Sequence, residues 1–282
     1  MLTSKILIVI VLYRTKLEES TSCKSLLAAI NKLPYSNYDV VIYENSAGLD
    51  EVRSRVFMDN RLLYVFNKNN NGTYGAYSWA LARARMANNE WMVTLDQDSE
   101  VSYEYLCELN DIANTNKDIA VALPRVIDGK NLQTVSPLNV RAGFLLRPNK
   151  WGIKGGNITG VASGAMFNVG FLSGMGGFNS EFVLDYQDHW VFQEIYKRRG
   201  KYHIMHATIY HDLSISSPDD VSEMRLLNIW NAEKKFYYHY RPRRDRYIYW
   251  LRALFRALKY LARYSRKKLA LKIIKIAFFL KI

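Results

Sequence analysis

The sequence predicts an α/β fold, with a mostly parallel central sheet flanked by helices and a C-terminal helical extension. Short β-branched apolar runs alternate with helical segments at the spacing of βαβ units. The first runs end in polar loops, which gather at one edge of a parallel sheet. With 282 residues, the chain is long enough for one large domain with a sizeable core.

The predicted elements follow in a regular order. The run KILIVIVLY at Lys5–Tyr13 is continuously apolar, as expected for a strand covered on both faces. Thr21–Leu33 has apolar residues at helical spacing and is followed by Pro34. The other strand candidates are Tyr38–Tyr43, Arg61–Phe66, Glu90–Leu95, Ile119–Leu123 and Val161–Val169. The other helix candidates are Ala76–Asn88 and His189–Arg199, the second closed by Gly200. Loops, turns or hairpins are expected at 67–75, 125–160 and 175–179.

The positive charge is confined to the C-terminal end of the chain. The net charge is +13, and residues 241–282 hold fourteen Lys or Arg and one acid. Residues 1–240 therefore hold 25 basic and 25 acidic side chains. We predict a neutral domain over residues 1–240 and a separate basic tail over residues 241–282. Basic excess of this kind points to nucleic acid or to an anionic membrane.

Cysteine usage argues against a disulfide-stapled protein, and hydropathy argues against a membrane-spanning segment. Cys23 and Cys107 have no metal-type spacing, so we expect free thiols in a reducing compartment. No uncharged apolar stretch approaches the roughly 20 residues that cross a bilayer. The apolar run at residues 6–13 has no small-residue cleavage site after it, and it is better interpreted as a strand than as a signal peptide.

The first motif that carries chemistry is Asp96-Gln97-Asp98, directly after the strand EWMVTL. A turn at Asp98 splays the two carboxylates, so that one can reach a ribose hydroxyl and the other a hard cation. Mg²⁺ and Mn²⁺ prefer such oxygen ligands and share them with substrate phosphates. The alternative is a solvated surface turn, but the position after a strand of a βαβ array favours a site.

The second motif is FVLDYQDHW, in which Asp185 and Asp188 are three residues apart at a predicted helix start. A carboxylate there is stabilised as an anion by the helix dipole, which suits a general base. The alternative role is N-capping. Capping explains one aspartate but not both.

In their order along the chain, these segments resemble a family 2 glycosyltransferase with the A-type nucleotide-sugar fold. The matching segments are KILIVIVLY, VVIYENSA, NKNNNGTYGAYSWAL, DQDS, ASGAMFNVGFLSGMGGFN and DYQD, and they span about residues 5–215. The DQDS and D-Y-x-D forms are most similar to bacterial rhamnosyltransferases of surface-polysaccharide (O-antigen or capsule) assembly. The resemblance implies an inverting, metal-dependent hexosyltransferase that uses Mg²⁺ or Mn²⁺.

The resemblance also implies roles for particular residues. Asp188 matches the catalytic base. The positions that match donor contacts are Tyr13, Glu44, Asn71, Asp96, Asp98 and Arg241. The positions expected to hold the metal are Asp98 and His211. The positions expected near the acceptor are Gly164, Asp185 and Trp190.

The basic tail has the pattern of an amphipathic helix. Its cations recur at steps of three and four, at Arg252, Arg256, Lys259, Arg263 and Lys267. Leucines and Phe255 lie largely off that stripe, and interfacial aromatics are expected at Tyr247, Tyr249 and Trp250. We predict helices that lie in the headgroup region of an anionic membrane. The alternative is a helix packed on the first domain with a solvated charged face.

Together these patterns predict sugar transfer from a nucleotide-diphosphate donor to a hydroxyl of a lipid-linked glycan. Rhamnose from dTDP-rhamnose is the first expectation for the donor, and a UDP sugar is the second. The protein is expected to be peripheral, at the cytoplasmic face of a bacterial inner or plasma membrane.

Two other functions remain as alternatives. A polyprenyl-phosphate sugar synthase has a phosphate acceptor and needs little base catalysis. A basic nucleic-acid-binding protein is the non-enzyme alternative. The neutral first domain and the lack of a nucleic-acid-reading motif argue against it, so no nucleic-acid partner is expected.

Overall fold

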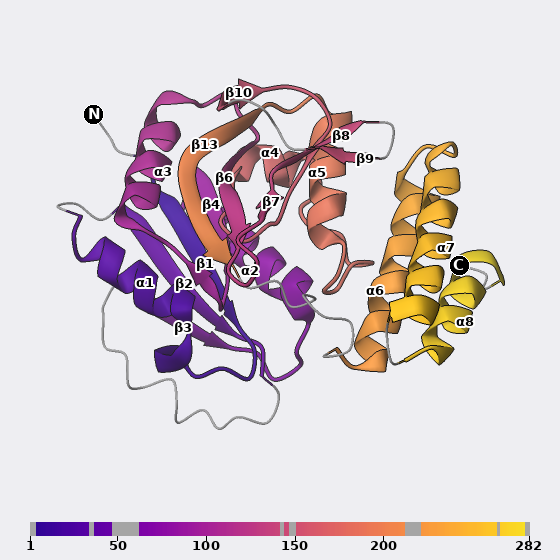
Figure 1. Cartoon of the computed structure of the whole chain (residues 1–282). Helices are drawn as coiled ribbons and strands as arrows, with labels where there is room; N and C mark the ends of the chain where they lie inside the picture. Colours follow the sequence, from indigo (N-terminus) through magenta and orange to yellow (C-terminus); the bar gives the residue numbers. More distant parts are fainter. Residues whose placement is uncertain are drawn as a thin grey trace. The chain divides into compact units, whose positions relative to one another are not determined.

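The computed structural model describes residues 4–33, 37–46, 62–141, 144–146, 151–211, 221–263 and 266–279 (Figure 1). The chain divides into two compact units. One comprises residues 1–139 and 146–212, and the other comprises residues 140–145 and 213–282. The second unit therefore includes helical residues that precede the sequence boundary predicted at residue 240.

A ten-stranded sheet forms the centre of the first unit. Its main strands, in spatial order, are β10 (Gly152–Lys154), β13 (Tyr202–His211), β6 (Val121–Asp128), β12 (Met166–Asn168), β4 (Trp91–Asp96), β1 (Ile6–Leu12), β2 (Tyr38–Glu44) and β3 (Leu62–Phe66). Two short strands join it, β5 (Ser99–Glu100) on β13 and β7 (Thr134–Ser136) on β6. A separate three-stranded sheet contains β11 (Ile158–Thr159), β8 (Leu138–Arg141) and β9 (Phe144–Leu146).

The sheet is mostly parallel, as the sequence predicts. β1 pairs in parallel with both β2 and β4, β2 pairs with β3, and β6 pairs with β13. The short strand β12 is antiparallel to both β4 and β6 and joins the two parallel groups. Every residue of β1 is buried, which explains its continuously apolar sequence.

Helices cover both faces of this sheet. The helices of the first unit are α1 (Thr21–Ile30), α2 (Gly72–Met86), α3 (Tyr103–Thr115), α4 (Val169–Gly174) and α5 (Gln187–Lys197), with a 3₁₀ turn η1 at Leu17–Glu19. The alternate residues Ile6, Ile8 and Ile10 share one core cluster with apolar residues of α1 and α3. Leu7 and Val9 lie outside that cluster, and α2 packs against β1, β4 and α4.

Two predicted boundaries differ from those of the structure, and the structure contains helices and strands that the sequence interpretation did not include. Helix α2 begins at Gly72, inside the segment expected to be a loop. The strand expected over Val161–Val169 is reduced to β12, because a turn precedes it and α4 begins at Val169. Helix α3 and strand β13 were not predicted. β13 has a bulge between Ile204 and Thr208, which breaks the alternation that marks a strand.

The second unit is a helical bundle. It contains α6 (Glu223–Lys235), the π-helical turn η3 (Phe236–Tyr240), α7 (Asp245–Arg263), α8 (Lys268–Ile274) and the π-helical turn η4 (Lys275–Phe279). α7 packs against α8, η3 and η4. Within the described ranges, no helix is both long enough and apolar enough to cross a membrane.

Candidate active site

The carboxyl ends of β1, β2 and β4 meet, as expected for parallel neighbours. The backbone N–H of Tyr13, just after β1, donates to Oε1 of Gln97 at 2.8 Å. The backbone N–H of Asn45, just after β2, donates to the carbonyl of Leu12 at 2.8 Å. The three polar loops of the sequence therefore lie together at one edge of the sheet, where α/β proteins bind ligands.

The turn that carries Asp96 and Asp98 is fastened to the start of helix α1. The Ser20 hydroxyl donates to the carbonyl of Gln97 at 2.8 Å, and the Ser22 backbone N–H donates to that carbonyl at 3.2 Å. The Ser22 hydroxyl contacts the Asp96 and Ser99 carbonyls and accepts from the Ser99 N–H at 2.9 Å. These bonds fix the turn that carries the two aspartates, and one carboxylate oxygen of each lies within 4.8 Å of the other.

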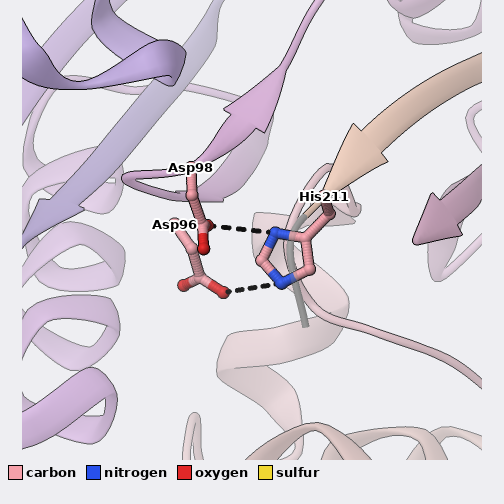
Figure 2. A group of neighbouring side chains, drawn as sticks. All are labelled: Asp96, Asp98 and His211. Carbon is pink, nitrogen blue, oxygen red and sulfur yellow. Dashed lines mark ion pairs between the residues drawn. The ribbon is translucent and has the colours of Figure 1, made fainter. Parts of the chain in front are cut away.

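A short antiparallel pairing brings a histidine to this turn. β5 directly follows Asp98, and its residue Ser99 pairs with His211, the last residue of β13. The His211 ring then faces the two aspartates, and each ring nitrogen lies closest to a different carboxylate (Figure 2). Nδ1 is 3.1 Å from Oδ1 of Asp98, and Nε2 is 3.9 Å from Oδ2 of Asp96.

A chain of hydrogen bonds orients the histidine from behind. The Asp96 backbone N–H donates to the Ser163 hydroxyl at 2.8 Å. The Ser163 and Ser99 hydroxyls are 2.7 Å apart, and Ser99 Oγ is 3.0 Å from Nδ1 of His211. When Nδ1 carries the proton and donates it to Ser99, the lone pair of Nε2 faces Asp96. Metal-binding histidines are held by such a partner on the second ring nitrogen.

The electrostatics of the site are dominated by clustered negative charge. Burial raises the pKa of Asp96 and the charges of Asp98 and Asp188 raise it further, although the His211 charge and a hydrogen bond from Tyr77 oppose the rise. The Tyr77 hydroxyl donates to Oδ1 of Asp96 at 3.1 Å. Burial, followed by the Asp96 charge, raises the pKa of Tyr77 well above its ordinary value.

Asp96, Asp98 and His211 fit a divalent cation. One ligand atom from each residue lies within 4.8 Å of the others. Oδ1 of Asp98 is buried and, within the described part of the chain, accepts no hydrogen bond, although it lies at ion-pair distance from His211. Buried carboxylate oxygens normally accept hydrogen bonds, so one that accepts none and faces a histidine suits a metal ligand.

Asp188 belongs to the same charged group. It lies in the first turn of α5, is half-buried, and influences the pKa of both Asp96 and Tyr77. Its Oδ1 accepts from the backbone N–H of His189 at 2.8 Å. The helix dipole stabilises a carboxylate in this position as an anion.

The start of α5 is tied to the glycine-rich turn before it. The side-chain amide of the buried Gln187 is oriented so that both its nitrogen and its oxygen have hydrogen-bond partners. Its nitrogen donates to the Phe182 and Asn179 carbonyls at 3.0 and 2.9 Å. In the same orientation it accepts from the Asn179 N–H at 2.9 Å. Tyr186 precedes the helix in the left-handed region, with φ 66°, a conformation uncommon for an aromatic residue. The chain reverses sharply here and then presents Asp188.

The start of α2 rests directly on this acidic segment. The Tyr74 N–H donates to the Val183 carbonyl at 3.1 Å. Gly72 has φ +61°, and a Cβ on it would lie 2.2 Å from the Val183 carbonyl oxygen. Only glycine allows this approach. The Asn-Gly loop is therefore in contact with the segment that leads to Asp188.

The predicted donor contacts lie in different environments. Tyr13 is 42% exposed at the sheet edge, and Asn71 is exposed immediately before α2. Glu44 is buried at the end of β2, where its carboxylate accepts from the Ser46 N–H at 2.9 Å and the Tyr64 hydroxyl at 3.4 Å. Arg241 belongs to the second unit, where its Nη2 is 2.6 Å from Oδ2 of Asp245. These four roles in donor binding stay predictions.

The predicted acceptor residues surround Asp188 in sequence or lie beside β4. Asp185 is half-buried, and Trp190 is buried in α5. Gly164 has φ +83°, and its N–H donates to the Thr94 carbonyl at 2.7 Å. A Cβ on Gly164 would lie 2.3 Å from Cδ1 of Ile209. Local packing therefore supplies a reason for this glycine, and acceptor contact by all three residues stays a prediction.

Sequence reasoning missed three residues that support the site, namely Tyr77, Ser99 and Ser163. Ser99 directly follows the acidic motif, so the sequence places it near the site. Its hydrogen bond to His211 depends on strand pairing between residues 112 positions apart, which the sequence does not show. Tyr77 falls in a predicted helix and has the pattern of an ordinary core aromatic. Ser163 lies in the small-residue segment ASGA, and nothing in the local sequence indicates its contact with Ser99.

The fold and this site define a glycosyltransferase of the A-type fold. Residues 8–171, more than half of the chain, match the family described as glycosyl transferase family 2. The chain therefore belongs to glycosyl transferase family 2. A search of curated proteins found no match.

Solved structures of S. aureus TarS share the fold. TarS 1-349 in complex with UDP-GlcNAc has a TM-score of 0.62 at 13% identity, over 97% of this chain and 81% of that chain. TarS 1-349 in complex with UDP has a TM-score of 0.54 at 13% identity, over 96% of this chain and 69% of that chain. TarS 1-349 itself has a TM-score of 0.55 at 12% identity, over 97% of this chain and 70% of that chain. At this identity the likeness establishes the fold alone.

Replacing Ser99 with alanine is expected to weaken Mn²⁺ binding by about 10- to 100-fold, because His211 loses the partner of its Nδ1. Calorimetric titration of the apoprotein with Mn²⁺ measures the change. Ser102→Ala is the matched control, since Ser102 caps α3 and does not contact the metal cluster. Equal Mn²⁺ affinity in Ser99→Ala and the unaltered protein would show that Ser99 does not position His211.

Gly164→Ala is expected to lower the free energy of unfolding by about 2–4 kcal/mol, through left-handed strain and overpacking against Ile209. Urea unfolding followed by tryptophan fluorescence measures this. Gly155→Ala, where a Cβ meets nothing within 4 Å, is expected to change stability by less than about 0.5 kcal/mol. A Gly164→Ala protein of normal stability that fails in transfer would instead support the predicted acceptor role.

Proposed function

We propose that this protein is a metal-dependent, inverting glycosyltransferase that moves a sugar from a nucleotide-diphosphate donor to an acceptor hydroxyl. One observation carries the proposal. In a chain of the glycosyl transferase family 2, the sheet edge brings Asp96, Asp98 and His211 together. The charge of Asp188 raises the pKa of Asp96, so Asp188 belongs to the same group. The site thus combines ligands for a cation with a separate carboxylate for proton transfer.

The donor half of the site is the edge formed by β1, β2 and β4. Tyr13 offers an exposed ring and Asn71 an exposed amide for the nucleoside. Asp96 is held in place by its backbone bond to Ser163 and by the Tyr77 hydroxyl, and its second oxygen is available to a ribose hydroxyl or to a cation. TarS binds UDP and UDP-GlcNAc in structures of the same fold, which supports a nucleotide-sugar donor here.

Asp98 and His211, with Asp96 beside them, are the residues that would hold Mg²⁺ or Mn²⁺. Such a cation, when bound, neutralises the charge that develops on the leaving diphosphate. The chain's own contribution is orientation, because Ser99 fixes the histidine and the α1 contacts fix the turn. Three carboxylates close together repel one another, so this cluster favours binding of a cation.

Asp188 is the general base of the proposed reaction. Its position at the start of α5 favours the anion, and the bonds of Gln187 to the preceding turn hold the backbone that carries it. The carboxylate accepts the proton of the acceptor hydroxyl as the oxygen attacks the anomeric carbon. Attack from the face opposite the leaving diphosphate is a single displacement, which inverts the anomeric centre.

For the substrates, we propose rhamnose from dTDP-rhamnose as donor and a lipid-linked glycan as acceptor, in bacterial surface-polysaccharide synthesis. The DQDS and D-Y-x-D forms support the sugar, and UDP sugars are the second choice. The basic second unit supports peripheral association with the cytoplasmic face of the inner or plasma membrane, where such acceptors are anchored.

Asp188→Asn is expected to lower kcat by about 10²- to 10⁴-fold, because the amide cannot accept the acceptor proton. Donor affinity is expected to stay near normal, since the amide keeps the shape of the carboxylate. Transfer assays together with nucleotide titration measure the two quantities. An active Asp188→Asn enzyme would favour transfer to a polyprenyl phosphate, and simultaneous loss of binding would argue against a base role.

A panel of nucleotide diphosphates and nucleotide sugars tests the donor class. dTDP and UDP ligands are expected to raise Tm only in the presence of Mn²⁺ or Mg²⁺, because the diphosphate is bound through the cation. Asp98→Asn is expected to abolish the metal-dependent part, whereas Asp118→Asn, an aspartate outside the site, is expected to leave it intact. Failure of every nucleotide diphosphate to stabilise the protein in a metal-dependent way would contradict the proposed function.

A further inference from the structure

Helix α7 carries a row of exposed apolar side chains, which we call the α7 ridge. The exposed fractions are 66% for Tyr247, 56% for Leu251, 45% for Leu254, 69% for Phe255, 52% for Leu258 and 50% for Leu261. Steps of three and four place these residues along one side of the helix. Contiguous apolar surface of this kind marks an interaction site.

The packing of the second unit uses the other sides of α7. The buried side of the helix is formed by Tyr249, Ala253, Ala257 and Tyr260. Tyr249 lies 5.5 Å from the Tyr237 ring, and Tyr260 lies 5.7 Å from the Trp230 ring. The bundle is therefore held by this side, and the α7 ridge is additional surface.

Part of the basic stripe expected to meet lipid is used inside the bundle. Nη1 of Arg252 donates to the Tyr237 hydroxyl at 2.6 Å. Nη1 of Arg256 donates to Glu233 at 2.6 Å, and Glu233 is 2% exposed. Tyr249, expected at an interface, is buried, and Trp250 donates to the Tyr238 hydroxyl at 3.1 Å. Of the three predicted interfacial aromatics, Tyr247 is the one in the ridge.

The remaining charge of this unit is positive, and part of it is exposed. The described residues 221–263 and 266–279 include sixteen Lys or Arg and three acids. Each acid forms an ion pair within the unit, Glu223 with Lys272, Glu233 with Arg256 and Asp245 with Arg241. Among the described residues on and after the second half of α7, the exposed cations besides Lys272, which pairs with Glu223, are Lys259, Arg263, Lys267, Lys268 and Lys275.

We propose that the α7 ridge inserts into the interfacial layer of an anionic lipid bilayer, while these exposed cations contact the headgroups. The inference rests on the membrane part of the proposed function and names the surface that carries it. An exposed apolar row flanked by cations complements an anionic lipid surface in both hydrophobicity and charge. A second copy bound through the same ridge would bring two strongly positive units together, which charge repulsion opposes.

Vesicle flotation tests the ridge. The full-length protein is expected to float with vesicles of phosphatidylglycerol and phosphatidylcholine, and far less with phosphatidylcholine alone. Replacing Leu254 and Phe255 together by serine is expected to lower the apparent affinity about ten-fold or more, because two apolar side chains no longer enter the bilayer. Met224→Ser is the matched control, since Met224 is 68% exposed on α6 of the same unit and lies outside the ridge.

A second pair of variants tests the charge. Replacing Arg263 and Lys267 by glutamine is expected to weaken binding to anionic vesicles about five-fold for each cation removed, and to reduce its salt dependence. Replacing Lys24 and Lys201, which are exposed cations of the first unit, is expected to leave binding unchanged. Circular dichroism and Tm confirm that each variant is folded.

The outcomes separate this inference from the transfer reaction. Unchanged flotation of the folded Leu254→Ser, Phe255→Ser variant overturns the inference. Self-association in sedimentation that this variant loses, without vesicle binding by the unaltered protein, also overturns it and assigns the ridge to a second copy. The metal-dependent nucleotide response is measured in the same variants without lipid. Its absence would contradict the transfer reaction even when flotation behaves as expected.

Discussion

The site depends on one short antiparallel pairing, between Ser99 of β5 and His211 of β13. It joins the turn that follows β4 to β13, a strand that begins more than a hundred residues later. Without it, Asp96 and Asp98 form an acidic turn at a sheet edge, a common feature with no special affinity for a cation. With it, an imidazole faces both carboxylates, and the Ser99–Ser163 pair links that imidazole to the backbone of Asp96.

Sequence reasoning succeeded where the physical signal is local. The apolar run of β1 and the polar residues that follow β1, β2 and β4 are adjacent in sequence, so the parallel sheet and its ligand edge could be predicted. The turn at Asp98 followed from the same pattern. His211 was assigned only through resemblance to a family, because its contact with Asp98 depends on strand pairing and not on spacing. β13 itself was missed, since its bulge interrupts the alternation, and the Glu108 carboxylate accepts from the His206 and Ala207 N–H groups.

The basic C-terminal region shows a different limit of sequence patterns. A helical wheel separates the cations of α7 from its leucines, but it does not state which side is buried. The structure buries Tyr249, Ala253 and Tyr260 and turns Leu254 and Phe255 outward. Small residues and tyrosines can pack closely against α8 and η3, whereas arginines at the edge of that contact reach Tyr237 and Glu233. Burial here follows the shape of the neighbouring helices, which a hydropathy pattern does not describe.

The contact between Gly72 and the Val183 carbonyl has a consequence for how this enzyme can diverge. The start of α2 and the segment before Asp188 touch through the backbone at Gly72 and Tyr74, and the Thr73 hydroxyl also donates to that segment. A lengthening of either loop must therefore displace the other. The conformations of the two segments are therefore linked, and a chimera that takes them from different relatives would inherit a mismatch at their point of contact.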